Sequence, residues 1–319
     1  INGKGFYRMS NNGSISYTRN GGFSLDKNGY IVSGNGQHLT GFQAVNGAIV
    51  PGVLTDLQLS STDLLPKASA SAGVGANLAS TDPILPSAGF VATNPATYNF
   101  STASTAYDSL GQSHTMTFYF NKTAANTWDT NVYIDGAAAN GAGVSSLSFS
   151  SSGTFASATN PVKTAALANG AAPLSITMDY SRMTQFGSGF GVNSLSQDGY
   201  ASGQLSGYNI GADGIILGRY TNGQTQSLGQ VALSNFTNPQ GLSPLGDSMW
   251  AESSNSGVPL TGAPGTASLG ALQSAAKEDS NVDLTAELVN MITAQRVYQA
   301  NAQSIKAQDA VLQTLVNLK

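Results

Sequence analysis

The chain has 319 residues, of which 40% are hydrophobic, 37 are glycine and only 9% are charged. This apolar content excludes a disordered chain, and the formal net charge of -4 excludes an electrostatic basis for binding nucleic acid. Because globular proteins average about 25% charged residues, we expect a surface made mainly of Ser, Thr, Asn, Gln and Gly on a β-rich fold.

The sequence contains few residues suited to catalysis or metal binding. Cysteine is absent, and His38 and His114, the two histidines, stand in no recognised metal-ligand or triad spacing. Glycosidase chemistry stays open because it needs two facing carboxylates. The central part of the chain has five candidates: Asp108, Asp129, Asp135, Asp179 and Asp198. Nearly all stand at predicted strand ends, where aspartate commonly shapes a turn. We therefore predict no enzymatic activity, metal, cofactor or small-molecule substrate.

The start of the chain and its apolar runs bear on targeting. No run approaches the roughly 18 apolar residues that cross a bilayer, and the opening INGKGFYRM lacks the apolar core of a secretory signal. If the protein is exported, we expect a route that leaves no such signal here, or a signal upstream.

The first predicted domain segment, residues 1–66, consists of short strands separated by glycine turns. The motif DKNG at 26–29 lies between two apolar runs, where a hairpin reverses. Asp26 and Asn28 also fit the opening of a calcium loop, but the remaining ligands are absent, so we predict a plain turn.

Residues 67–197 are richer in Ala, Ser, Thr and Gly, with sparser strands. In TMTFYF at 115–120, Met116, Phe118 and Phe120 alternate with less apolar residues, which predicts one packed and one solvated strand face. We expect a β-barrel or β-sandwich domain here.

Residues 198–274 return to the hairpin pattern of the opening segment, with GADG at 211–214 as a turn. The simplest topology inserts the domain at 67–197 into a discontinuous outer β domain built from 1–66 and 198–274. The predicted fold is therefore mainly β, nested and multi-domain, and it ends in a helical segment at 275–319.

That segment predicts one helix of roughly 35 residues, beginning at a capping-box-like pair, Ser280 and Asp283. Its apolar residues recur at steps of three and four, interrupted by Gln295 and Asp309. They are Leu284, Leu288, Met291, Tyr298, Ala302, Ile305, Leu312 and Val316. Docking on its own domain is the simpler alternative, but a helix about 50 Å long exceeds what a small β domain covers. We expect it to pack, as in a coiled coil, on other helices, either from a part of the chain not present here or from neighbouring subunits.

Several stretches resemble one family. YTRNGGFSLDKNGYIV at 17–32 is similar to an N-proximal segment of bacterial flagellar rod and hook axial proteins, and 280–318 resembles their C-terminal helix almost throughout. Residues 107–120, 197–205 and 222–242 are similar to the flagellar hook proteins in particular.

The resemblance implies a structural subunit of the flagellar hook. Copies assemble into a short, curved, hollow tube, a flexible universal joint that transmits torque from rod to filament. The implied partners are other copies of the chain, the rod, hook cap and hook-filament junction proteins, and the flagellar export apparatus. The implied location is extracellular, after unfolded export by the flagellar type III pathway. Family chains begin with an N-terminal helix that pairs with the C-terminal one, and since this chain opens in the first β domain we expect 280–319 to be poorly protected.

The resemblance also implies roles for particular residues. Six would form the assembly interface of the terminal helix: Leu284, Leu288, Met291, Tyr298, Ile305 and Leu312. Four would present a neutral polar face to the tube's channel, or simply a solvated face: Gln295, Asn301, Gln303 and Gln308. The hairpin motif contains Tyr17, Arg19, Asn20 and Phe23, for which folding of the outer β domain is favoured over direct subunit contact.

Two other functions stay open. A distal rod subunit shares the hairpin and the terminal helix, although the long insertion at 67–197 favours the hook. A secreted β-sandwich module would bind glycans through exposed aromatics of the central domain, for which the candidates are Tyr107, Trp128, Tyr133 and Tyr180. Aromatics at strand spacing are, however, more often part of a core.

Overall fold

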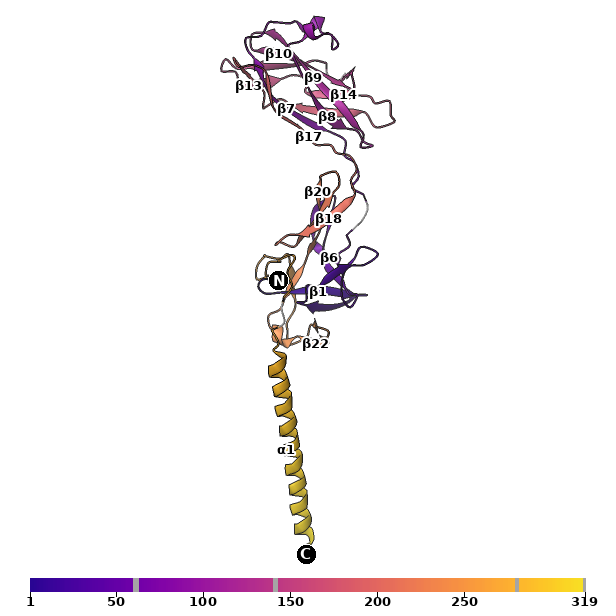
Figure 1. Ribbon diagram of the computed structural model, residues 1–319, viewed down its shortest axis with the longest axis vertical. Coiled ribbons are helices and arrows are strands. Elements are labelled where there is room, and N and C mark those ends of the chain that lie inside the picture. The colour runs from indigo at the N-terminus through magenta and orange to yellow at the C-terminus, as the bar shows by residue number, and fades with distance from the viewer. Residues whose placement is uncertain (60–62, 140–142, 279–280, 318–319) are drawn as a thin grey trace.

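The computed structural model describes residues 1–59, 63–139, 143–278 and 281–317, with the side chains of the last helix described as far as residue 313. Three parts follow one another along the long axis (Figure 1). A region of strands at one end is joined by two linker segments to a second region of strands near the N-terminus, and helix α1 (Leu284–Asn317) extends from there to the opposite end. We call these strand regions distal and proximal.

The proximal region is one 13-stranded arrangement built from both ends of the β-rich sequence, with the path β18-β19-β20-β5-β1-β2-β23-β22. Its strands are β1 (Phe6–Asn11), β2 (Ser14–Thr18), β3 (Phe23–Leu25), β4 (Ile31–Ser33), β5 (His38–Val45), β6 (Ala48–Asp56), β18 (Leu205–Ile210), β19 (Ile215–Tyr220), β20 (Thr225–Val231), β21 (Leu233–Asn235), β22 (Ser243–Gly246), β23 (Met249–Ala251) and β24 (Leu260–Gly262), with a 3-10 turn η3 (Pro239–Gly241). β1 and β20 both pair with β5, so segments about two hundred residues apart share one sheet.

Both predicted hairpin turns of this region are confirmed. β3 pairs antiparallel with β4, and Oδ1 of Asp26 accepts hydrogen bonds from the N–H groups of Asn28 (2.9 Å) and Tyr30 (2.7 Å). Asp26 therefore shapes the turn by capping backbone donors. β18 pairs antiparallel with β19 around Gly214, whose φ of +79° suits glycine.

The distal region is a sandwich of two sheets. The six-stranded sheet has the path β13-β12-β10-β9-β8 with β11 on β10, and the five-stranded sheet has the path β14-β15-β7-β16 with β17 on β7. The strands are β7 (Ser71–Ala79), β8 (Phe100–Tyr107), β9 (Ser113–Ala124), β10 (Thr127–Ile134), β11 (Ala137–Ala138), β12 (Ser145–Phe149), β13 (Phe155–Ala158), β14 (Val162–Ala165), β15 (Leu174–Asp179), β16 (Thr184–Phe186) and β17 (Gly191–Gln197), with 3-10 turns η1 (Ser87–Gly89) and η2 (Pro95–Thr97).

One apolar core lies between these two sheets, as expected for facing sheets with alternating side chains. Met116, Phe118 and Phe120 of β9 are fully buried and pack in the same cluster as β7 and β15, which confirms the predicted alternation. A separate cluster around Met9 and Leu39 fills the proximal region.

The exposed aromatic platform considered for glycan binding is not formed. Trp128 of β10 and Tyr180, directly after β15, are buried in the distal core, so neither ring lies on the surface. Tyr133 is half-buried and packs edge-on against Tyr119, with ring centroids 5.4 Å apart.

Helix α1 begins later than predicted. Its first residue is Leu284, and Oδ1 of Asp283 accepts hydrogen bonds from the N–H groups of Thr285 (2.8 Å) and Ala286 (3.3 Å). Asp283 is thus the N-cap rather than the third helical residue of a capping box, while Ser280 lies outside the described residues. In the described part of the chain, no helix combines the length and the apolarity needed to cross a membrane.

Candidate assembly surfaces

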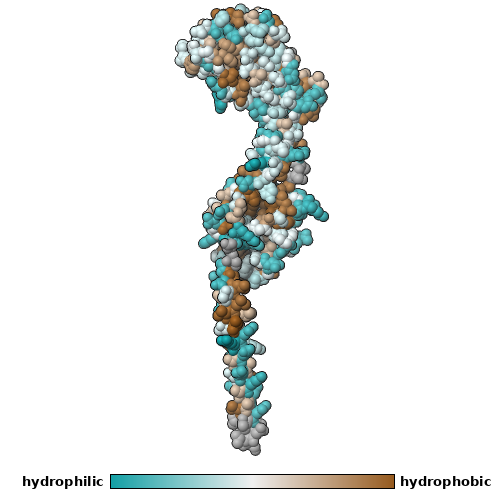
Figure 2. Space-filling model, in the orientation of Figure 1, coloured by the Kyte–Doolittle hydropathy of each residue, from teal (hydrophilic) through white to brown (hydrophobic). Residues whose placement is uncertain are grey.

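The six predicted interface residues of α1 all lie on its solvent-exposed surface. Every described side chain of the helix is exposed except Ala302, which is half-buried. Exposure reaches 72% for Leu284 and 77% for Tyr298, and Figure 2 shows apolar residues along the helix surface, most densely in its first turns. Their exposure in the single chain leaves their role in assembly as a prediction.

The spacing of these residues defines a coiled-coil seam. Leu284, Met291, Tyr298, Ile305 and Leu312 follow one another at intervals of seven residues. An ideal straight helix drifts by about 20° per seven residues, so a partner that follows this row winds around α1 with a left-handed twist. The companion row four residues later begins with Leu288 and has polar Gln295 and Asp309 at alternate positions. Polar residues at such positions fix register and partner number at some cost in stability.

The predicted polar residues of the helix are also exposed. Gln295, Asn301, Gln303 and Gln308 all face solvent in the single chain. Asn301 and Gln308, seven residues apart, share one side of the helix, whereas Gln295 in the companion row and Gln303 lie on other parts of its surface. The geometry therefore does not choose between a channel wall and an ordinary solvated surface.

The hairpin motif lies at the end of the proximal region from which α1 leaves, where Arg19 meets Glu278. We call this end the base. Tyr17 is buried, and its ring meets Phe236 edge-on with centroids 4.8 Å apart. Phe23 is half-buried and meets Tyr7 in the same way at 4.9 Å. Edge-on aromatic pairs add to ordinary burial, so these two residues hold the base together.

Arg19 joins the two ends of the β-rich sequence. Its Nε donates to both carboxylate oxygens of Glu278, at 3.0 and 3.1 Å. Nη1 donates to the carbonyls of Gly3 and Gly5, both at 3.0 Å, and Nη2 to the carbonyl of Ile1 at 3.2 Å. The planar guanidinium suits several acceptors at once, so Arg19 holds the entering segment against the segment that leads into α1.

Asn20 shapes the turn after β2. Its Oδ1 accepts from the Gly22 N–H at 3.0 Å, and its own N–H donates to Oγ1 of Thr18 at 3.1 Å. Asn20 therefore satisfies two backbone positions of this turn, and the folding role expected for the motif stays a prediction. Beside the motif lies an open groove of about 740 Å³, lined in part by Arg19, Trp250 and Glu278.

A cluster of titratable groups in the distal region was not anticipated from the sequence. Nδ1 of His114 lies 2.6 Å from Oδ2 of Asp135, and Nε2 lies 3.2 Å from Oδ2 of the buried Asp108. Asp108 also accepts from Asn169. His114, Asp108 and Asp135 are separate candidates in the sequence. Their spacing carries no local signal, because strand pairing brings them together.

The environment shifts the pKa values of this cluster in opposite directions. Burial alone would raise the pKa of Asp108, but hydrogen bonds from Gln112, Asn169, His114 and Leu110 lower it to about 2. Burial alone would lower the pKa of His114, but hydrogen bonds and charge from Asp135 and Asp108 raise it above 6.5. Both ring nitrogens face carboxylates, so the imidazolium is the favoured form. Within the described residues, no group of three or more His, Cys, Asp or Glu side chains is arranged to hold a metal ion.

Comparison with known proteins places nearly the whole chain in one family. The family described as Flagellar hook protein FlgE/F/G D1 domain matches residues 1–62, Flagellar basal body protein FlaE D2 domain matches 77–200, and Flagellar basal body rod FlgEFG protein C-terminal matches 273–318. Flagellar hook protein FlgE of Escherichia coli (strain K12) is 40% identical over 329 residues, which cover 100% of this chain and 81% of that protein. The chain belongs to the flagellar hook protein family.

Other relatives agree with this assignment. Flagellar hook protein FlgE of Rhizobium meliloti (strain 1021) is 34% identical over 334 residues, which cover 100% of this chain and 79% of that protein. The crystal structure of Helicobacter pylori flagellar hook protein FlgE2 is similar in fold, with a TM-score of 0.61 and 15% identity over 81% of this chain and 93% of that one. These relatives favour the hook protein over the rod subunit and over the glycan-binding module.

Proposed function

We propose that this protein is the structural subunit of a flagellar hook and that it acts by polymerising with copies of itself into a hollow, flexible tube. The observation that carries the proposal is the row of exposed apolar side chains at seven-residue intervals on helix α1. Isolated surface apolar residues are common, but a continuous row of this length on one helix indicates a partner helix. The family membership supports the same function.

The driving force for this assembly is the hydrophobic effect. Burying one exposed Leu, Ile or Met side chain contributes about 1.5–3 kcal/mol, and the row repeats such residues from Leu284 to Leu312. Because this force has no preferred direction, register depends on the polar interruptions at Gln295 and Asp309. The coiled-coil seam would therefore combine cohesion with a defined alignment.

Each part of the chain has its own proposed role. Residues 275–319 would form the axial core of the tube, 1–66 and 198–274 a discontinuous domain around it, and 67–197 an inserted outer domain. The separate cores of the proximal and distal regions support this division. Tyr17, Arg19, Asn20 and Phe23 would act by folding the base from which the helix leaves.

Partners and location follow from membership of the family. Association with the flagellar hook and rod is supported in general by the matches to hook and rod families. The finer proposal is contact with the rod, hook cap and hook-filament junction proteins, and extracellular placement after type III export. No catalytic role is proposed.

A helix variant tests the assembly surface. In cells of the source bacterium, Met291→Glu should abolish hooks, because a carboxylate in the coiled-coil seam would be buried without a partner. Thr293→Glu, which adds the same charge at an exposed position on the side of the helix opposite Met291, should leave hooks intact. Electron microscopy of detached flagella gives the readout, and urea unfolding of the β regions checks that both variants fold alike. Normal hooks from Met291→Glu would exclude this helix face as the interface.

Immunogold labelling tests the location. Antibody against residues 67–197 should label the short curved segment of detached flagella that carry their basal bodies. Label on the rod would indicate the rod subunit instead. A protein abundant outside the cell but absent from every flagellar structure would contradict the proposed function as a whole.

A further inference from the structure

The turn between β8 and β9, residues 108–112, lies against both segments that link the two β regions. At Gly111, φ is +82° and there is no room for a side chain: a Cβ there would lie 2.8 Å from Cβ of Pro66, 3.3 Å from N of Ser202 and 3.4 Å from Cα of Ala201. Pro66 belongs to the linker that enters the distal region, and Ala201 and Ser202 belong to the linker that leaves it. A side chain at position 111 would thus collide with the entering linker and crowd the leaving one, so glycine is what lets the turn lie against both.

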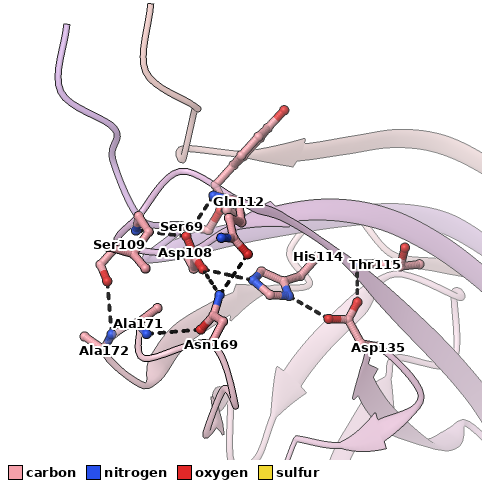
Figure 3. Close-up of polar contacts among 12 residues, drawn as sticks. Ser69, Asp108, Ser109, Gln112, His114, Thr115, Asp135, Asn169, Ala171 and Ala172 are labelled. Carbon is pink, nitrogen blue, oxygen red and sulfur yellow. Dashed lines mark hydrogen bonds and ion pairs between the residues drawn. The ribbon is translucent and has the colours of Figure 1, made fainter.

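The turn itself is rigid. Oδ1 of Asp108 accepts from the N–H groups of Leu110 (2.9 Å) and Gln112 (2.8 Å), and the Asp108 N–H donates to the Gln112 carbonyl at 3.0 Å. Such a carboxylate fixes a turn by satisfying its backbone donors. His114 approaches the other carboxylate oxygen (Figure 3).

A neighbouring loop braces the turn from the side away from the linkers. Nδ2 of Asn169 donates to Oδ2 of Asp108 at 2.5 Å and to Oε1 of Gln112 at 3.1 Å. The Ala172 N–H donates to Oγ of Ser109 at 3.0 Å (Figure 3). Moving the turn away from the linkers would therefore break its hydrogen bonds to residues 169–172 of the distal region.

The linkers are fixed to each other and to both regions. Leu64 pairs antiparallel with Gly203 and Lys67 with Tyr200, so the linkers form a short two-stranded ribbon. On the distal side, the Ser69 N–H donates to the Tyr107 carbonyl at 2.8 Å, directly before the turn.

On the proximal side, Nδ2 of Asn222 donates to the Ala201 carbonyl at 2.7 Å. A two-stranded ribbon alone is weak. Its orientation therefore depends on what it rests against.

We propose that the turn at 108–112 is an abutment: a rigid stop, held by Asp108, on which the linker ribbon rests and which limits rotation of the distal region about that ribbon. This inference goes beyond the proposed function, because it concerns the geometry of the single chain and does not require assembly. Its consequence is a restricted angle between the two β regions, set by the close approach of Gly111 to Pro66.

Distance measurements on the full chain test the abutment. Because the chain has no native cysteine, Ser14→Cys in the proximal region and Ser175→Cys in the distal region, both exposed positions, give a unique pair of spin-label sites. Pulsed EPR should give one narrow distance distribution for this background protein. Gly111→Ala should shift or broaden it, since the added methyl pushes Pro66 and Ser202 away.

A matched glycine separates this effect from backbone strain. Gly136 has a φ of +79° and nothing within 4 Å of the Cβ position, so Gly136→Ala imposes similar strain without touching the linkers. It should leave the distance distribution unchanged. Equal distributions for Gly111→Ala and Gly136→Ala, in folded proteins, would overturn the abutment.

A change on the linker side keeps the test decisive if Gly111→Ala fails to fold. Pro66→Gly removes the Cβ that the turn approaches, whereas Pro66→Ala releases the same backbone angle and keeps that Cβ. Leu65→Gly compared with Leu65→Ala measures the backbone freedom that glycine adds to this linker at a side chain that is 79% exposed. The broadening from Pro66→Ala to Pro66→Gly should clearly exceed that from Leu65→Ala to Leu65→Gly. Equal broadening would mean that the ribbon is limited by its own stiffness and not by the turn, and would contradict the proposal.

Discussion

Trp128 donates a hydrogen bond from Nε1 to Oε1 of Gln185 at 2.8 Å inside the distal core. Trp128 belongs to β10 of one sheet and Gln185 to β16 of the other, so this bond crosses the sandwich. Nε2 of Gln185 in turn donates to Oδ1 of Asn126 at 2.9 Å. The contact fixes one relative position of the two sheets, because an indole N–H buried without an acceptor is costly.

Gln185→Leu should destabilise the distal region by about 1–3 kcal/mol, because the Trp128 N–H loses its acceptor in a fully buried position. The measurement is urea unfolding followed by Trp128 fluorescence in a Trp250→Phe background, since these are the two tryptophans of the chain. In a Trp128→Phe background, followed by circular dichroism, the same substitution should cost distinctly less. An equal cost in both backgrounds would show that the hydrogen bond is not the cause.

Asp283→Ala should fray the first turn of α1, because two N–H groups lose their capping carboxylate. Losing such a cap costs about 0.5–2 kcal/mol of helix stability. Hydrogen exchange measured by mass spectrometry should become faster in the first turn, with little change in the β regions. Asp283→Asn keeps a capping oxygen and should stay close to wild type; if it frays like the alanine variant, the negative charge rather than the cap is responsible.

Arg19→Lys should loosen the base of the proximal region, because a single ammonium cannot replace the fork that meets Glu278 and three carbonyls. We expect faster hydrogen exchange for residues 1–5 and 270–278. Glu278→Gln, which removes one charge and keeps an oxygen acceptor, should have a smaller effect because the ion pair is partly exposed. Unchanged exchange in Arg19→Lys would contradict the proposed role of this side chain.

Stability of the distal region should depend on pH through the cluster at His114. Asp108, with its pKa lowered to about 2, contributes stability above its ordinary pKa of 3.8 and loses it as the pH falls toward 2. His114, with a raised pKa, contributes fully below 6.5 and loses that contribution as the pH rises through its folded value. Urea unfolding at a series of pH values should therefore give a maximum between pH 3.8 and 6.5.

His114→Gln should remove the fall in stability at higher pH, because a glutamine between Asp108 and Asp135 has no proton to lose. The matched control is His38→Gln in the proximal region, where the ring lies 2.8 Å from Asp56. In His38→Gln, urea unfolding followed by Trp128 fluorescence should still show stability falling as the pH rises. If the stability of His114→Gln still falls as the pH rises, another titratable group causes that fall.

The sequence by itself determined the local elements. Alternation at 115–120 placed Met116, Phe118 and Phe120 in a core because successive strand side chains point to opposite faces. Asp26 and the glycine turns located hairpins because their conformations are local. Apolar residues at steps of three and four located α1, although its start was misplaced because both Ser280 and Asp283 are residues that cap helices.

Only the tertiary structure decided which distant polar groups meet. Arg19 contacts Glu278 across 259 positions, and Trp128 contacts Gln185 across 57. Asp108, His114, Asp135 and Asn169 converge because strand pairing brings separate turns to one edge of the sandwich. A hydrogen bond depends on the distance and direction between two groups, and local sequence patterns contain no information on either when the partners come from separate strands. The same reason explains why Trp128 was considered for a surface platform and why the approach of Gly111 to Pro66 was not foreseen.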